Sequence, residues 1–233
     1  IKKHFNDVSL MYWPKEVRLR EESALNELIN EQKENIKFQL FLQFLAYKQY
    51  LNLKQYANNN GIQLIGDIPI YVSYDSSDVW TRPELFMLDQ ENLPTYVAGV
   101  PPDNFSKDGQ LWGNPLYNWK NHEDEQFAWW IKRIKNQIEL FDMIRIDHFI
   151  GFVNYYKIPG TDKTAVNGVW EKAPGRALFQ QIKKELGDLN IIAEDLGVLT
   201  DEVKELLKET GFPGMKLLQF GFSSDPNNEY LPH

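Results

Sequence analysis

Short apolar runs alternate with amphipathic helices over most of this chain, and this alternation constrains the fold more than any other feature. The apolar and β-branched runs predict four strands, at residues 62–72, 142–149, 190–196 and 214–222. Helical spacing and end signals predict helices between them, at residues 122–140, 174–186 and 201–210. Strands joined by helices are typical of right-handed βαβ units, so the sequence predicts an α/β fold with a parallel sheet.

The predicted sheet is too short to close on itself. A TIM-type (β/α)8 barrel needs eight strands and roughly 250 residues, whereas this chain has 233 residues and four predicted strands. The sheet is therefore either open or part of a barrel. The chain starts without a methionine and stops abruptly after "NNEYLPH". We therefore expect a partial barrel from a longer protein, truncated before the final strands.

Two helices precede the first predicted strand. Residues 14–31, opened by Pro14, and residues 34–59, closed by "NNNG", both carry apolar residues at helical spacing. These features divide the chain into a helical segment, residues 1–60, packed on the partial barrel of residues 61–233. Residues 73–120 and the segment between 149 and 174 are expected to be irregular.

The charge and the absence of cysteine exclude several classes of protein. A net charge of −8 argues against nucleic acid or an anionic membrane as a partner, because both attract basic surfaces. Without cysteine there is no disulfide and no thiol nucleophile, which fits a cytoplasmic protein. No apolar run approaches the roughly 20 residues of a membrane helix. The open edges of a partial sheet are a liability, and a homodimer is one way to cover them.

Two charged residues end the predicted strand at 142–149. Side chains alternate along a strand, so Arg145 and Asp147 share one face, at the end where α/β folds place their sites. His148 is on the other face, where we expect it to pack behind the strand. An adjacent guanidinium favours the ionised form of a carboxyl group, and a covalent nucleophile must be ionised. The alternative is a structural ion pair that closes the strand.

The next predicted strand also ends in acids. Glu194 and Asp195 follow the apolar run "NIIA", and Glu194 is expected at the same rim as Asp147. A carboxyl group in apolar surroundings keeps its proton more readily, which suits a general acid. Carboxyl groups on adjacent strands form the paired-acid arrangement of glycoside chemistry. Asp195, on the opposite face, would cap the following turn. The alternative is that both residues merely begin a loop.

Polar and aromatic side chains gather in three loops. "GDIPIYVSYDSSDVW" (66–80) places Asp67 at a strand end, and "PPDNFSKDGQLWGNPLYNW" (101–119) carries Asp103, Trp112 and Tyr117. In "WEKAPGRALF" (170–179), Trp170 either lines a cleft or covers a helix start. Long ordered loops are usually functional, and aromatic rings beside Asp and Asn are typical of a sugar-stacking surface. Core packing is the alternative for each ring.

A metal site is a further alternative. Asp67, Asp147, Glu194 and Asp195 could ligate Mg²⁺ or Mn²⁺, which prefer oxygen ligands. Arg145 on the same face argues against a dication there, and no motif has the spacing of a metal site. We therefore expect neither a metal nor an organic cofactor.

Four motifs resemble a known family. "RIDHF" (145–149), "AEDLG" (193–197), "GDIPIYVSYDSSDVW" (66–80) and "GQLWGNPLY" (109–117) are similar to those of the 4-α-glucanotransferases, the amylomaltases and disproportionating enzymes of glycoside hydrolase family 77. The motifs occur in the family's order, and the resemblance extends over about residues 60–220.

The resemblance implies an α-amylase-type (β/α)8 barrel that transfers a segment of an α-1,4-glucan to a glucan or glucose acceptor with retention. It implies that Asp147 is the nucleophile, Glu194 the acid/base and Arg145 the residue that orients Asp147. Trp112 and Asn114 would line the donor-side sugar sites. The partners would be α-1,4-glucans and maltooligosaccharides, without a cofactor. The remaining residues expected to bind substrate are Asp67, Asp103, Tyr117 and Asp195.

One family feature is missing from this sequence. The family has a third carboxylate in a downstream "THDN" motif, which these 233 residues do not contain. We therefore expect the chain by itself to be inactive. Three other functions stay open: an α-glucan hydrolase of the same clan, a metal-dependent barrel enzyme, and a non-catalytic glucan-binding module. The last would leave Asp147 and Glu194 on different faces of the sheet.

Overall fold

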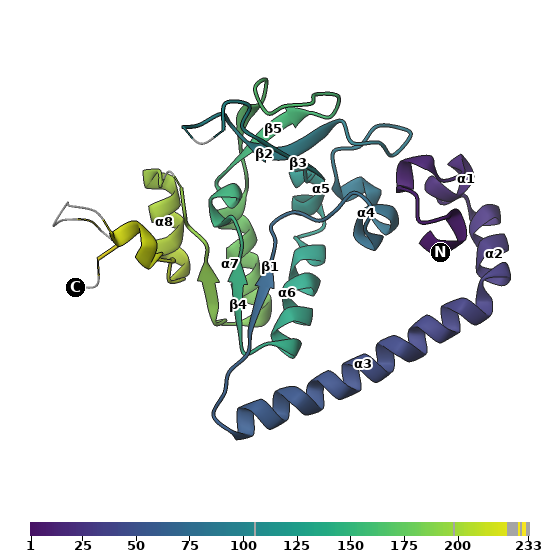
Figure 1. Ribbon diagram of the computed structural model, residues 1–233, viewed down its shortest axis with the longest axis horizontal. Coiled ribbons are helices and arrows are strands. Elements are labelled where there is room, and N and C mark those ends of the chain that lie inside the picture. Colours follow the sequence, from purple (N-terminus) through teal and green to yellow (C-terminus); the bar gives the residue numbers. More distant parts are fainter. Residues whose placement is uncertain (105, 198, 223–227, 229, 232–233) are drawn as a thin grey trace.

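Three parallel strands form the centre of the molecule (Figure 1). They are β1 (Ile65–Ile68), β4 (Met143–Ile146) and β7 (Ile191–Ala193), in the order β1-β4-β7. The structure is a computed structural model that describes residues 1–104, 106–197, 199–222, 228 and 230–231. The register places Asp67 opposite Arg145, and Arg145 opposite Ile192. The predicted parallel pairing is therefore confirmed, with shorter strands than expected.

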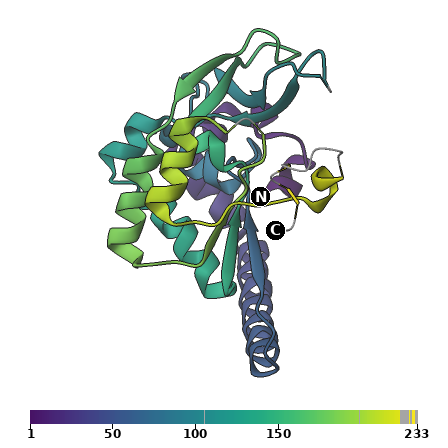
Figure 2. The same cartoon turned by 90° about the vertical axis from the view of Figure 1, so that its left-hand side faces the viewer.

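Helices cover one side of this sheet (Figure 2). They are α6 (Ala128–Leu140), α7 (Gly175–Leu186) and α8 (Asp201–Thr210). The Thr200 side chain caps α8 by accepting a hydrogen bond from the Val203 amide, and Gly211 ends it in a left-handed conformation. Ile144 and Ile146 of β4 are fully buried in the core that these helices share with the sheet. The α/β class predicted from the sequence is confirmed.

A second, antiparallel sheet lies beyond the C-terminal ends of the parallel strands (Figure 1). It has the order β3-β2-β5-β6. Its strands are β2 (Tyr96–Val100), β3 (Gln110–Pro115), β5 (Asn154–Pro159) and β6 (Val169–Lys172). The expectation of irregular structure at residues 73–120 and 149–174 is therefore wrong in part. β2 pairs with a strand about 60 residues away, and such distant pairing is not visible in local propensity.

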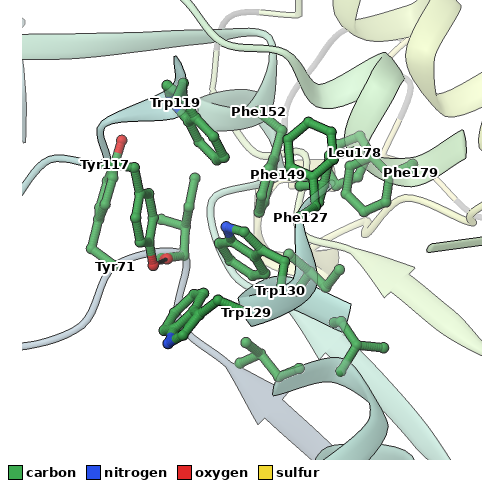
Figure 3. Close-up of a cluster of buried hydrophobic side chains, with 14 of the residues drawn as sticks. Tyr71, Tyr117, Trp119, Phe127, Trp129, Trp130, Phe149, Phe152, Leu178 and Phe179 are labelled. Carbon is green, nitrogen blue, oxygen red and sulfur yellow. Dashed lines mark hydrogen bonds between the residues drawn. The ribbon is translucent and has the colours of Figure 1, made fainter. Parts of the chain in front are cut away.

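Aromatic side chains fill much of the core beside the parallel sheet (Figure 3). Trp130 and Phe152 meet edge to face, with ring centroids 5.2 Å apart. Arg133 of α6 lies over the ring of Trp130 and donates a hydrogen bond to the carbonyl oxygen of Pro69, 2.7 Å away. This contact ties α6 to the segment after β1. The labelled rings are those of Tyr71, Tyr117, Trp119, Phe127, Trp129, Trp130, Phe149, Phe152 and Phe179.

The N-terminal residues form a helical segment. It contains η1 (Lys2–Phe5), η2 (Leu10–Tyr12), α1 (Lys15–Arg18), α2 (Glu22–Glu31) and α3 (Lys33–Asn59). The single helix predicted at 14–31 is wrong, because Arg20 has a left-handed φ of 60° and separates α1 from α2. The Arg20 guanidinium donates to the carbonyl oxygen of Thr81, and this tertiary contact has no sequence signature.

The two ends of the helical segment contact the rest of the molecule differently. Near the N-terminus, Trp13 packs edge to face on Trp80 of α4 (Ser77–Thr81). The long helix α3 extends away from that contact (Figure 1) and meets the body again through Lys54 and Asn58, which both contact the Asp142 carboxylate. The division at residue 60 into two domains stays a prediction.

The helix predicted at 122–140 is divided in two. Gln126 and Phe127 have left-handed φ values of 55° and 58°, and they separate α5 (Trp119–Asp124) from α6. Just before this break, the Glu125 carboxylate accepts a hydrogen bond from the Trp129 amide in the first turn of α6. Because the apolar residues of 122–140 keep helical spacing and no Gly or Pro interrupts them, the sequence does not signal this break. Two further short helices are η3 (Pro83–Leu85), which follows α4, and η4 (Phe149–Phe152), which follows β4.

The fourth parallel strand, predicted at 214–222, is absent from the described residues of that range. The segment runs along the end of β7 instead. The Ala193 amide donates to the carbonyl oxygen of Pro213, and the Met215 amide donates to Oδ1 of Asp195 at 2.8 Å. The chain then forms η5 (Leu218–Gly221). The Met215 amide therefore donates to the Asp195 side chain, whereas in a sheet it would donate to the main chain of a neighbouring strand. Within the described residues, no helix has the length and hydrophobicity needed to cross a membrane.

Candidate active site

Arg145 lies between two carboxylates at the rim of the parallel sheet. Its Nη1 donates to Oδ1 of Asp67 at 2.6 Å, and its Nη2 donates to Oδ1 of Asp147 at 2.7 Å. Partial burial acts to lower the pKa of Arg145, but hydrogen bonds and charges of Asp67 and Asp147 outweigh it and raise this pKa above its usual value. The arginine is therefore a permanent cation that fixes both carboxylates.

Glu194 lies next to this group, directly after β7. Its side chain is buried, and Oε2 accepts a hydrogen bond from the His148 amide at 2.8 Å, while Oε1 accepts one from the Leu196 amide at 3.0 Å. The main chain joins the two strand ends as well, because the Phe149 amide donates to the carbonyl oxygen of Glu194. The structure thus brings Asp147 and Glu194 together at the ends of adjacent strands.

His148 leaves the alternation of the strand. Its φ of 52° is left-handed, and its ring lies edge to face against Trp112, with centroids 5.0 Å apart. The prediction that His148 packs behind the strand is therefore wrong. Burial lowers the pKa of His148 to about 4, although the charge of Asp147 acts in the opposite direction. At neutral pH the imidazole is uncharged and can both donate and accept a hydrogen bond.

A groove of about 560 Å³ begins at this histidine. Trp112 and Trp170 supply aromatic surface, and Asp103 and Gln110 supply polar groups. Gln110 accepts a hydrogen bond from the Trp112 indole, 3.1 Å away, which fixes the ring. A concave, largely apolar site with a few polar groups is typical of ligand binding. The lining residues that sequence reasoning missed are Val100, Pro101, Gln110, Ile150, Asn154, Leu196, Gly197, Thr200 and Val203.

The missed residues share a physical origin. They come from β2 and the residue after it, from β3, η4 and β5, from the loop after β7 and from the start of α8. The antiparallel sheet and the βαβ fold bring these segments to one place. Their residue types are ordinary for strands and loops, so no local sequence signal marked them as groove residues.

Comparison with known proteins decides the family. The sequence matches the family described as 4-alpha-glucanotransferase over residues 1–233. The chain belongs to this family. It is 50% identical to a 4-alpha-glucanotransferase of Clostridium butyricum over 234 residues, and 51% identical to one of Thermus thermophilus over 221 residues. These alignments cover 100% and 95% of this chain.

The chain spans about half the length of the curated relatives it matches, 48% and 44% for these two. Among solved structures, an amylomaltase from Streptococcus agalactiae in complex with acarbose is 51% identical and superposes with a TM-score of 0.94. That match covers 98% of this chain and 46% of the amylomaltase. The α/β fold is therefore that of part of an amylomaltase.

Tyr117 does not belong to the groove. Its side chain is 1% exposed, and its hydroxyl donates to the carbonyl oxygen of Ile70 at 2.6 Å. Figure 3 shows its ring within the aromatic core. Its ring is enclosed by Phe86, Trp129 and other aromatic side chains. The expectation that Tyr117 binds substrate stays a prediction, and this position does not favour it.

Asp195 has a structural role. Its carboxylate is buried, and it accepts the hydrogen bond from the Met215 amide described above. The expectation that Asp195 contacts substrate stays a prediction. The expected cap of the following turn is wrong, because Asp195 accepts from Met215, whereas the Leu196 amide of that turn donates to Glu194. Asn114 donates from its side chain to the carbonyl oxygen of Val72 at 3.0 Å. Its role in sugar binding stays a prediction.

The acidic residues of the rim are held by an arginine and by backbone amides. In the part of the chain that the structure describes, no group of three or more His, Asp or Glu side chains is arranged to hold a metal ion. Between Asp67 and Asp147 the positive charge is supplied by the Arg145 guanidinium.

Proposed function

We propose that the full-length protein carrying this chain is a 4-α-glucanotransferase that moves a segment of an α-1,4-glucan to a glucan or glucose acceptor. The observation that carries this proposal is the arrangement of two carboxyl groups on adjacent strand ends. Glu194 is hydrogen-bonded to the amide that follows Asp147, and Arg145 engages Asp147 itself. The family membership of the chain supports the same reaction.

Asp147 is the proposed nucleophile. The Arg145 hydrogen bond engages Oδ1, so Oδ2 is the oxygen proposed to attack the anomeric carbon of the donor. Attack forms a bond from Oδ2 to C1 and breaks the bond from C1 to the glycosidic oxygen, which leaves a covalent glycosyl–aspartate. A carboxylate held in one orientation by a permanent cation loses little freedom when it reacts.

Glu194 is the proposed acid/base. In the first step its carboxyl proton goes to the departing glycosidic oxygen, and in the second step the carboxylate takes the proton of the acceptor hydroxyl as that oxygen attacks C1. Two displacements at one carbon retain its configuration. Retaining pairs have carboxyl groups about 5–5.5 Å apart, against about 6.5–9.5 Å for inverting pairs.

The groove is the proposed binding surface for α-1,4-glucans and maltooligosaccharides. Trp112 and Trp170 are each partly exposed there and can stack on sugar rings, and neutral His148 can hydrogen-bond a sugar hydroxyl. The Streptococcus agalactiae amylomaltase is in complex with acarbose, and a ligand bound to that relative supports a binding groove in this chain. A cytoplasmic location and a homodimer stay proposals, and two plant relatives are described as chloroplastic/amyloplastic.

Products formed from maltotriose test the proposal on the full-length protein. A transferase gives glucose together with maltooligosaccharides longer than maltotriose, whereas a hydrolase of the same clan gives only shorter sugars. Addition of EDTA should leave the rate unchanged, because Arg145 rather than a dication neutralises the carboxylates. Absence of longer products, or loss of the activity with EDTA, would contradict the proposal.

The isolated 233 residues provide a second test. They lack the family's downstream "THDN" motif, so we expect no measurable disproportionation of maltotriose by this chain alone. Robust formation of maltotetraose and longer sugars would show that the third carboxylate is dispensable.

A further inference from the structure

The guanidinium of Arg145 has a partner on each of its donor edges. Nη1 faces Asp67 and Nη2 faces Asp147, as described above, while Nε lies 3.3 Å from the Sδ atom of Met215. A thioether sulfur is a weak hydrogen-bond acceptor, and this separation is close enough for an N–H···S contact. The plane of the guanidinium is thus fixed on three sides, by two anions and one neutral atom.

Met215 is itself held in place by the fold. Its amide donates to Oδ1 of Asp195, and the Ala193 amide donates to the carbonyl oxygen of Pro213 two residues earlier. Gly214 lies so close to Asp195 that a Cβ atom there would be 2.3 Å from Oδ2. The backbone before Met215 is therefore fastened to the end of β7, the strand that Glu194 directly follows.

We infer that Met215 is a positioning residue for the proposed nucleophile Asp147, acting through Arg145. The inference rests on the proposed function. By accepting the Nε–H, the thioether fixes rotation of the guanidinium about its stem, so that Nη2 stays on Oδ1 of Asp147. Since Asp195 holds Met215 and Glu194 directly precedes Asp195, the same strand end sets the position of both proposed catalytic carboxyl groups.

A neutral acceptor suits this position better than a charged one. A third carboxylate near Arg145 would compete with Asp67 and Asp147 for the same cation. A purely aliphatic side chain would leave the partly buried Nε–H without this acceptor, which carries a cost for a charged donor. The polarisable sulfur satisfies the donor without adding charge.

The rival explanation is that Met215 only fills space beside Arg145. The two explanations make opposite predictions for two substitutions of similar volume. Met215→Leu keeps the apolar bulk and removes the acceptor, whereas Met215→Gln keeps an acceptor oxygen at a similar reach and removes the apolar end. Leucine for methionine is usually well tolerated in packing.

The test compares both variants in the full-length protein, with kcat and KM measured for maltotriose disproportionation. We expect Met215→Leu to lower kcat about tenfold with KM within about twofold, because no sugar contact is removed and transition-state stabilisation is lost. Met215→Gln should restore kcat to within about threefold of the unsubstituted protein. Met87→Leu, at a partly buried position that packs against the core and does not line the groove, is the matched control and should leave both constants unchanged.

The outcomes separate this inference from the function it rests on. A Met215→Leu variant with unchanged kcat, or a Met215→Gln variant slower than Met215→Leu, would overturn the positioning role while transferase activity of the unsubstituted protein stands. Absence of transfer in the unsubstituted protein would instead contradict the proposed function. Thermal melting of each variant checks that the comparison is between folded proteins.

Discussion

The residues on the two faces of strand β4 serve different purposes: one face packs in the core, and the other carries the charged groups proposed for catalysis. Ile144 and Ile146 point into the core and are 0% exposed, whereas the alternating residues Arg145 and Asp147 keep side chains that are 27% and 41% exposed at the rim. One short strand, together with the residue that follows it, therefore serves both purposes. The difference teaches that substitutions one position apart should have unrelated consequences.

The same contrast separates two aromatic residues that are close in the sequence, one in β3 and one just after it. Trp112 is 37% exposed and faces the groove, while Tyr117 is 1% exposed and faces the core. Both rings have similar neighbours along the chain, among them Gly, Asn and Pro. Residue type thus did not distinguish a groove-facing ring from a structural one.

The largest effect is expected on the open face of β4. In the full-length protein, Asp147→Asn should lower glucan transfer at least about 10³-fold, because a neutral amide does not form the covalent intermediate. The melting temperature should change little, since the side chain is exposed at the rim. Product chromatography from maltotriose measures the activity. Asp124→Asn on the surface of α5 is the control, and near-normal turnover of Asp147→Asn would remove Asp147 from the mechanism.

The next effect concerns the buried face of the same strand. Ile146→Ala should lower the free energy of unfolding by about 2–5 kcal/mol, because it leaves a cavity in a packed core. Urea denaturation of the full-length protein measures this. Ile62→Ala, at a position 56% exposed, should cost far less. Equal costs at the two positions would contradict the assignment of the faces.

Stability should also depend on pH through His122 of α5, which is buried among aromatic rings. Burial lowers the pKa of His122 to about 4, and the charge of Glu125, which opposes this, does not compensate. Between its usual value near 6.5 and about 4, the unfolded state binds a proton that the folded state does not. The free energy of unfolding is therefore greatest above about pH 6.5 and should decrease by up to about 3 kcal/mol as the pH falls through this window.

Urea denaturation between about pH 4.5 and 7.5 measures that slope. His122→Asn should reduce the slope, whatever its effect on stability at neutral pH, and His148→Asn should reduce it as well because the pKa of His148 is also lowered to about 4. His4→Asn at the N-terminal surface is the control. A slope unaffected by His122→Asn would show that this imidazole is not the group that titrates.

The smallest expected effect tests the two rings. Tyr117→Phe removes the hydroxyl that donates to Ile70 and accepts from Arg133. It should lower the free energy of unfolding by about 1–2 kcal/mol, with KM for maltotriose unchanged. Trp112→Ala should do the opposite, raising KM with little loss of stability. Tyr12→Phe, on a ring 72% exposed, controls for removal of a hydroxyl. A raised KM in Tyr117→Phe would return Tyr117 to the binding site.

Much of the parallel core was predictable because its signals are local. Helices α3, α7 and α8 follow apolar periodicity and end signals, and the charges at the end of β4 interrupt an apolar run. The antiparallel sheet was missed because pairing between β2 and β5 is distant in sequence. The prediction of a strand at 214–222 was wrong because the Met215 amide donates its hydrogen bond to the Asp195 carboxylate.

By itself, the sequence determined the α/β class, the family and the two carboxyl groups proposed for catalysis. This was possible because strand alternation and the order of motifs can be read directly from the sequence. Only the tertiary structure decided that His148 faces Trp112, that Tyr117 and Asp195 belong to the fold, and that Met215 reaches Arg145. These contacts join residues far apart in the chain or depend on a left-handed backbone. Neither is encoded in residue type or spacing, since both follow from how the packed elements meet.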